Sequence, residues 1–263
     1  MIQLGMTDCP AVRRLKTQNA LHLDYLEVHG PYLEDARRVY PDAPMLLHNA
    51  LYQWSLVHPD GLKHRDCACL TQSRLALARS PWYSLHLGFS SETVDFLDTC
   101  MVGTSPVLAP EQIFERTLRT LTGLIDLLPV PILVENMDYN PGGAYETICQ
   151  PEFIRRVVNT ASVGLLLDLA HAQISAAALD LPVREYLLLL PLERVGQIHV
   201  NHPEWNGARL WDAHEALQEE DYELLEWSLA RCQPRAVTLE YNRDEAQILT
   251  QVGRLRQMLG AEG

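Results

Sequence analysis

The sequence lacks a basic character, a long apolar run and a targeting segment, and each absence argues against a class of protein. The 263 residues include 21 lysines and arginines against 34 aspartates and glutamates, which gives a formal net charge of −13. This charge argues against a nucleic-acid partner, whose binding surface should be basic, although bound cations could offset carboxylates locally. No apolar run approaches the roughly 20 residues of a membrane-spanning helix, so we expect no membrane association. The first residues, MIQLGMTDCP, show no basic region followed by an apolar region, so we expect no signal peptide.

Cysteine is sparse and irregularly spaced. The six cysteines are Cys9, Cys67, Cys69, Cys100, Cys149 and Cys232. Only the second and third lie close together, and a single residue between two cysteines is not the spacing of a zinc ribbon. We therefore expect six reduced thiols in a cytoplasmic protein.

Eight short apolar runs alternate with segments of helical spacing, a pattern that predicts an α/β fold with a parallel sheet. The predicted strands are Ile2–Met6, His22–Val28, Met45–His48, Trp82–Phe89, Ile132–Asn136, Val163–Leu169, Val195–Val200 and Ala236–Tyr241. A (β/α)8 barrel needs about 250 residues, close to the length of this chain. We therefore expect residues 1–263 to form a single TIM-barrel domain. No internal repeat, low-complexity tract or linker interrupts the pattern.

The segments between the strands are expected to form helices and loops. The strongest helix signal covers Pro110–Leu127, whose apolar residues recur with helical spacing. The other predicted helices are one that ends near Asn19, Glu34–Tyr40, Arg65–Arg79, Pro151–Ala161, Ala172–Leu179, Val183–Leu190, Asp212–Arg231 and Asp244–Leu259. The predicted loops include Leu51–Lys63, Ser90–Ala109 and Pro203–Gly207.

Side chains that commonly bind metals stand at or just beyond the C-terminal ends of the predicted strands, where barrels of this type carry their working residues. The set comprises His48, His86, Glu135, Asp168, His171, His199, Asp212, His214 and Glu240. Several carboxylates at one mouth would repel one another and raise their pKa values unless cations neutralised them. Nitrogen and oxygen donors without aligned cysteine suit zinc, manganese or iron. The set therefore predicts a multinuclear metal site.

Each of these residues, taken alone, has an ordinary alternative role. A single histidine on an apolar strand is more often a hydrogen-bonded core residue. An aspartate or glutamate that ends a strand is more often an ion-pair partner or a helix N-cap, and Asp212 could cap the helix predicted to follow it. The alternatives fail jointly, because so many buried and unpaired polar groups would cost several kcal/mol per buried charge.

A second set of polar residues lies near the same strand ends and could contact substrate or orient the metal ligands. These residues are His29, Asn136, Tyr139, Asn201, His202, Trp205 and Asn242. Ordinary loop polarity is the alternative for each of them. The role of His202 is open, because the H-x-x-H spacing with His199 could also be metal chemistry.

The order of these residues along the chain resembles that of the trinuclear-metal barrels, from His48 to Glu240. Two families share this order: zinc nucleases of the endonuclease IV type, and multinuclear non-heme iron-dependent oxidases that modify cysteines of ribosomally made peptides, as in methanobactin biosynthesis. Sugar isomerases of the xylose-isomerase type share the barrel but not the full ligand set. Several sequence segments resemble the strand-end motifs of the iron family: ILVEN, GLLLDLAHA, VGQIHV, WDAHEAL and TLEYN. The loop VNHPEWNG departs from that family's usual glycine-bearing version.

The resemblance implies an enzyme that uses two or three iron ions, as Fe(II) and Fe(III), and dioxygen to modify peptide cysteines. By position, one iron would be held by Glu135, Asp168, His199 and Glu240, and these four residues would carry catalysis. A second would have His48, His86 and a bridging Glu135, and a third His171, Asp212 and His214. The resemblance also implies a precursor-peptide substrate and a separate partner protein that captures the leader of that peptide.

Two other functions remain open at this point. The first is a zinc- or manganese-dependent phosphodiesterase or sugar isomerase on the same barrel. The second is a barrel that binds a metal or ligand without catalysis. The acidic charge disfavours the nuclease, because no basic stretch is placed to follow phosphates. The complete ligand set disfavours the inactive binder.

Overall fold

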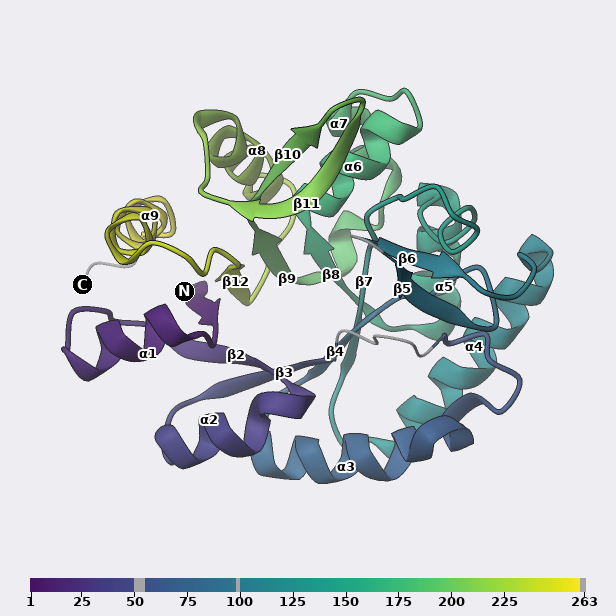
Figure 1. Cartoon of the computed structure of the whole chain (residues 1–263), viewed down its shortest axis with the longest axis horizontal. Coiled ribbons are helices and arrows are strands. Elements are labelled where there is room, and N and C mark those ends of the chain that lie inside the picture. Colours follow the sequence, from purple (N-terminus) through teal and green to yellow (C-terminus); the bar gives the residue numbers. More distant parts are fainter. Residues whose placement is uncertain (50–54, 98–99, 261–263) are drawn as a thin grey trace.

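The computed structural model describes residues 1–49, 55–97 and 100–260, and in it eight short parallel strands close into a barrel (Figure 1). Around the barrel the strands follow the order β1-β12-β9-β8-β7-β4-β3-β2. Their bounds are β1 Gln3–Thr7, β2 Tyr25–His29, β3 Met45–Asn49, β4 Tyr83–His86, β7 Ile132–Glu135, β8 Gly164–Asp168, β9 Val195–Val200 and β12 Ala236–Leu239. Each of them overlaps one of the eight predicted apolar runs. The predicted (β/α)8 barrel is therefore confirmed.

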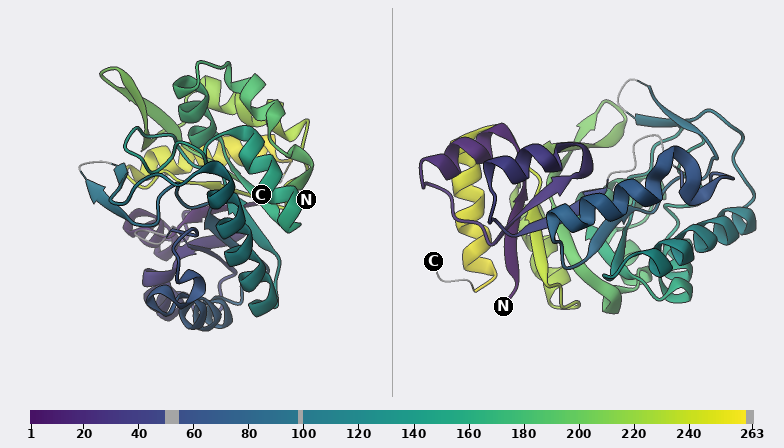
Figure 2. Two further views of the ribbon diagram at one scale, coloured as in Figure 1. Left: turned by 90° about the vertical axis from the view of Figure 1, so that its right-hand side faces the viewer. Right: turned by 90° about the horizontal axis from the view of Figure 1, so that it is seen from below.

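Helices surround the strands (Figure 1), and most of their buried apolar side chains belong to the hydrophobic core. They are α1 Pro10–Thr17, α2 Leu33–Val39, α3 Cys67–Ala78, α4 Pro110–Leu127, α5 Pro151–Ala161, α6 Leu169–Ala178, α7 Val183–Leu189, α8 Glu219–Leu229 and α9 Glu245–Met258, with 3-10 turns at Gly30–Tyr32, Gly61–Asp66 and Leu192–Arg194. Figure 2 shows α9 running beside α1, where Arg14 Nε lies 2.5 Å from Glu245 Oε1. None of the helices in the described part of the chain is long and apolar enough to cross a membrane.

The barrel interior divides into an apolar floor and a polar mouth because side chains alternate along each strand. The floor is a cluster of buried residues: Tyr25, Leu46, Trp82, Leu133, Leu166 and Ala236. The residues two or four positions further along the same strands share the inward face. They are Glu27, His48, His86, Glu135, Asp168 and Glu240. The strand pattern itself therefore places carboxylates and imidazoles together above an apolar base.

Two of the predicted loops are wrong, because each contains an antiparallel hairpin. The segment Ser90–Ala109 contains β5 (Val94–Leu97), which pairs with β6 (Cys100–Gly103). The segment Pro203–Gly207 lies largely in β10 (His202–Asn206), which pairs with β11 (Arg209–Glu215). Isolated two-stranded ribbons bury little surface, so their apolar alternation is short and hard to recognise. Figure 1 shows both hairpins beside the barrel. The predicted irregular segment Leu51–Lys63 falls partly outside the described residues.

The predicted helix Asp212–Arg231 is also wrong in its first turns. Asp212 lies within β11, and the helix begins only at Glu219, so Asp212 is not a helix N-cap. The N-cap is instead Gln218, whose backbone N–H donates a hydrogen bond of 2.8 Å to Oδ2 of Asp221 in the first turn. The strand therefore presents Asp212 toward the barrel mouth, in which it lines a cavity.

Candidate metal centre

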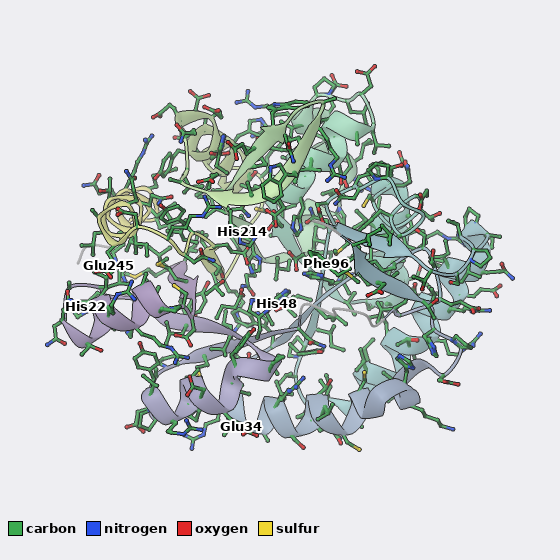
Figure 3. The ribbon with its side chains drawn as sticks, viewed as in Figure 1. His22, Glu34, His48, Phe96, His214 and Glu245 are labelled. Carbon is green, nitrogen blue, oxygen red and sulfur yellow. The ribbon has the colours of Figure 1, made fainter. Side chains whose placement is uncertain are left out.

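A cavity of about 630 Å³ opens at the C-terminal ends of the barrel strands. Seven of the nine predicted ligands line it, and Asp168 and His199 lie buried beneath them with 0% and 1% exposure. Aromatic and apolar side chains of the two hairpins complete the wall, among them Phe96 and Trp211. In Figure 3 His48, His214 and Phe96 lie over the middle of the barrel, whereas His22, Glu34 and Glu245 lie at its edge.

Glu135 ends β7 at the centre of this group, and its two carboxylate oxygens face different imidazoles. Oε2 lies 3.2 Å from His48 Nε2 and 3.4 Å from His86 Nε2. Oε1 lies 3.4 Å from His171 Nδ1 and 3.6 Å from His199 Nδ1. A carboxylate placed in this way can bridge two cations, one on each oxygen.

Asp168, His199 and Glu240 form a second group around Glu135. His199 Nδ1 lies 3.4 Å from Glu240 Oε1 and 3.9 Å from Asp168 Oδ2. Asp168 also caps α6, because its Oδ1 accepts a 2.7 Å hydrogen bond from the backbone N–H of His171. The cap uses one oxygen and leaves Oδ2 directed at the imidazoles.

The third group joins α6 to the hairpin β10–β11. Asp212 Oδ2 lies 2.7 Å from His214 Nε2 and 3.6 Å from His171 Nε2, and His214 Nε2 lies 3.9 Å from Glu240 Oε2. The backbone of His214 has a φ of 49°, a left-handed conformation that is uncommon for a residue other than glycine. Such strain is found where the surrounding structure fixes a functional side chain.

The pKa values of the carboxyl and imidazole groups in the site are strongly shifted, and the two carboxyl groups Glu135 and Asp168 shift in opposite directions. Burial would raise the pKa of Glu135, but the charges of His86 and His48 hold it well below its ordinary value. Burial raises the pKa of Asp168 to about 8. Burial would lower the pKa of His214, but Asp212 raises it to about 10. With no cation present, protonated His214 thus balances the charge of Asp212, whereas Asp168 is mostly protonated at pH 7.

Several buried atoms of the site have no hydrogen-bond partner among the described residues, and this tests whether the site fits metal ions. They are Glu135 Oε2, Asp168 Oδ2, His199 Nδ1 and Asp212 Oδ1. Donor atoms of His48, His86 and Glu135 lie within 4.8 Å of one another, as do those of Glu135, Asp168 and His199. Unpaired buried acceptors are costly unless a cation completes them, so these residues fit bound metal.

The residues predicted to contact substrate or orient ligands are divided between several environments. His29 and Asn242 line the cavity. Asn136 instead braces the site: its amide donates to the Asp168 carbonyl oxygen and its Oδ1 accepts from the Asp168 N–H, both at 2.9 Å. Asn201 directly follows β9 and is 1% exposed. Their assignment to substrate binding stays a prediction.

The other three predicted contact residues are not among the residues that line the cavity. Tyr139 is partly buried against the hydrophobic core. His202 Nδ1 pairs with Asp221 Oδ2 at 2.7 Å, and Trp205 is 62% exposed on β10. The H-x-x-H alternative therefore gains no geometric support, because His202 faces α8 rather than Glu135.

Sequence reasoning missed Glu27, which is fully buried in β2 and lies 2.9 Å from His199. The sequence contains one indication of its role: Glu27 is a charged residue within an otherwise apolar strand, two positions beyond the core residue Tyr25. It also missed Asp138, whose carboxyl lines the cavity and whose pKa is raised by burial to about 6.

Comparison with known proteins assigns the chain to a family. Residues 18–258 match the model of the family described as "RiPP precursor modification enzyme MbnB/TglH/ChrH". The chain belongs to this family. The resemblance predicted from the strand-end motifs is therefore confirmed, as is the expectation of an enzyme family.

Curated relatives of the chain carry the name UPF0276 protein. A UPF0276 protein from Paraburkholderia phytofirmans is 31% identical over 165 residues, which are 60% of this chain and 52% of that protein. A UPF0276 protein from Anaeromyxobacter is 27% identical over 197 residues, 74% of this chain and 66% of that protein. The chain thus spans about half to two thirds of the length of these curated relatives.

Solved structures share the fold of this family member at low sequence identity. A D-tagatose 3-epimerase-like protein gives a TM-score of 0.69 at 14% identity, covering 98% of this chain and 97% of that one. Endonuclease IV from Thermus thermophilus gives 0.62 at 19% identity, covering 99% and 100%. These similarities show the xylose-isomerase-like barrel and nothing further about chemistry.

Proposed function

We propose that the protein is a multinuclear non-heme iron-dependent oxidase that uses O2 to modify cysteine residues of a ribosomally synthesised precursor peptide. The observation that carries this proposal is Glu135, whose two oxygens face two different pairs of imidazoles in a member of a peptide-modifying family. A bridging carboxylate surrounded in this way suits two adjacent cations. Nitrogen and oxygen donors alone, without a cysteine, suit iron as well as zinc or manganese.

The residues would divide the metal ions among three groups. His48 and His86 would hold one ion together with Glu135. Asp168, His199 and Glu240 would hold a second on the other side of Glu135. The remaining group would hold a third through His171, Asp212 and His214. When bound, the iron ions supply a Lewis acid and redox chemistry with dioxygen at the bottom of the cavity.

The surrounding residues position the ligands and exclude water. Asn136 fixes the turn after β8 through its two hydrogen bonds to Asp168, and its carbonyl oxygen lies 2.9 Å from His171 Nδ1. An N–H at Nδ1 can donate to this carbonyl, which leaves Nε2 of His171 to face Asp212. Phe96 and Met101 add apolar surface to the cavity wall, which would shield a peptide thiol from bulk water.

A cavity open at the barrel mouth and walled by two hairpins suits an extended peptide that inserts one side chain. The family supports a precursor peptide as substrate. We propose that a separate partner protein captures the leader of that peptide, and that the reaction takes place in the cytoplasm.

The test measures oxygen consumption and peptide mass with iron-loaded protein. A panel of cysteine-containing peptides is compared with the same peptides carrying serine in place of cysteine. The proposal predicts oxygen uptake and a mass change with cysteine peptides only, and only when iron is present. If zinc- or manganese-loaded protein instead cleaves abasic-site DNA or isomerises a sugar in the strict absence of oxygen, the proposal is wrong and the metal-dependent hydrolase or isomerase is favoured.

A further inference from the structure

Among the residues that the structure describes, Glu27 is the one fully buried carboxylate of the barrel interior that the three proposed metal groups do not use. It lies on β2 with 0% exposure, and its Oε2 is 2.9 Å from Nε2 of His199. Its position in the strand places it between the apolar floor and the mouth, directly beneath the proposed centre. A buried carboxylate without a partner would be strongly destabilising, so the groups that Glu27 contacts indicate its role.

The orientation of Glu27 is fixed by a chain of hydrogen bonds that starts at an indole. Trp82 Nε1 is a donor only, and it lies 2.9 Å from Gln197 Oε1, so the amide group of Gln197 must turn its NH2 the other way. That NH2 donates to Glu27 Oε2 at 2.6 Å and to Thr238 Oγ1 at 2.9 Å. The carboxylate oxygen that faces His199 is thereby held in place from below.

The contact with Glu27 also fixes the tautomer of His199. Glu27 Oε2 accepts a hydrogen bond from the Gln197 amide, so it is an acceptor toward His199 as well, and His199 Nε2 must donate the proton of this pair. The Gln197 nitrogen also lies 3.2 Å from His199 Nε2, but Glu27 and Thr238 take both of its hydrogens. In the metal-bound state the other nitrogen, Nδ1, is then left with its lone pair. Nδ1 is buried, has no hydrogen-bond partner among the described residues, and faces Glu135, Asp168 and Glu240.

We propose that Glu27 is a positioning residue that acts through His199. It holds the imidazole as the Nε2–H tautomer, directs Nδ1 at the metal ion shared with Asp168 and Glu240, and raises the basicity of that nitrogen. A carboxylate behind a metal-binding histidine is a recurrent way to strengthen the metal–nitrogen bond. This inference rests on the proposed metal centre, but neither on the identity of the metal nor on the oxidase reaction.

The test uses Co2+ alone as the probe, because its absorption spectrum reports both binding and ligand geometry. Metal-free wild-type protein, Glu27→Gln and the control Asp24→Asn are titrated with Co2+. Asp24 is three residues earlier and accepts a 2.7 Å hydrogen bond from the Leu4 N–H at the other end of the barrel. We expect Glu27→Gln to bind the same number of ions as wild type, with the affinity for one of them lowered by about 10- to 100-fold and its absorption bands shifted. Asp24→Asn should match wild type.

Two results would overturn the inference. Glu27→Gln could bind Co2+ with wild-type affinity and spectrum, or it could lose one ion completely, which would make Glu27 a direct ligand through its unpaired Oε1. If wild-type protein binds no Co2+ at all, the proposal of a metal centre is wrong, and this outcome is distinguishable from the other two.

A second measurement on wild-type protein needs no variant to fold. Nitrogen-15 NMR of Zn2+-loaded protein reports which ring nitrogen of His199 carries the proton. We expect a protonated Nε2 with slow proton exchange and a metal-bound Nδ1. A proton on Nδ1 would contradict the proposed role of Glu27.

Discussion

Replacing Glu135 by glutamine should remove more metal than any other single substitution in the site. The carboxylate is 1% exposed, and four imidazole nitrogens lie between 3.2 and 3.6 Å from its two oxygens. A neutral amide offers one weak oxygen donor and leaves the other position to an NH2 group, which repels a cation. We therefore expect Glu135→Gln to lose at least one and up to two metal ions per chain.

The same substitution should destabilise the metal-free protein. At an effective dielectric constant of about 20, a carboxylate and an imidazolium 3.4 Å apart attract each other by about 5 kcal/mol. Desolvation and partial deprotonation of the imidazoles reduce the net effect, and breaking a buried ion pair typically costs about 3–5 kcal/mol. We therefore expect the free energy of unfolding to fall by about 3 kcal/mol at neutral pH.

The assay combines metal content per chain after dialysis with urea unfolding of chelator-treated protein. Glu146→Gln is the matched control, because Glu146 accepts a backbone hydrogen bond from Gly143 and lies outside the three proposed metal groups. It should keep all metal. If Glu135→Gln retains full metal while His202→Ala empties the site, Glu135 is not the bridging ligand, and the H-x-x-H pair of His199 and His202 is the centre of the site.

Three further predictions concern the third ion, acid stability and the barrel interior. His171→Ala should lose one ion per chain and keep the other two, as measured by elemental analysis. Burial, aided by a neighbouring imidazole, lowers the pKa of His29 to about 4. The unfolded state therefore binds this proton first, and the free energy of unfolding should fall by up to about 3 kcal/mol as the pH drops from 6.5 to 4. Urea unfolding of His29→Gln should depend less steeply on pH, and an unchanged dependence would contradict this role of His29. A methyl group at Gly5 would lie 2.3 Å from the Tyr25 ring, so Gly5→Ala should lower the melting temperature, whereas Gly253→Ala, with open space in α9, should not.

The barrel could be predicted from the sequence because its strands are fully buried. Runs such as ILVE and GLLLD are apolar on both faces, and each stops at a carboxylate, so the strand and its functional end were visible together. The hairpins could not be predicted in the same way. Residues of β5 and β10 are mostly exposed, so no buried face imposes a clear pattern on them.

The residues of the candidate site could also be predicted only in part from the sequence. Residues that end strands were found because polar side chains there interrupt an apolar run, as at Glu135. Glu27 was overlooked because it lies within a strand, and only the barrel geometry brings it against His199, 172 positions later in the chain. Asp212 was found as a candidate, but its helical context was misjudged, since the acidic turns of α8 begin just beyond the strand that carries it.

The most direct test of the proposed centre is a crystal structure of protein purified without chelator from iron-supplemented cells, with anomalous diffraction recorded on both sides of the iron absorption edge. The proposal predicts two or three iron peaks in the cavity, with two of them bridged by Glu135 and each within about 2.0–2.3 Å of its imidazole or carboxylate ligands. An anomalous signal from zinc alone, an absence of peaks, or ions held by residues other than the nine at the barrel mouth would contradict it.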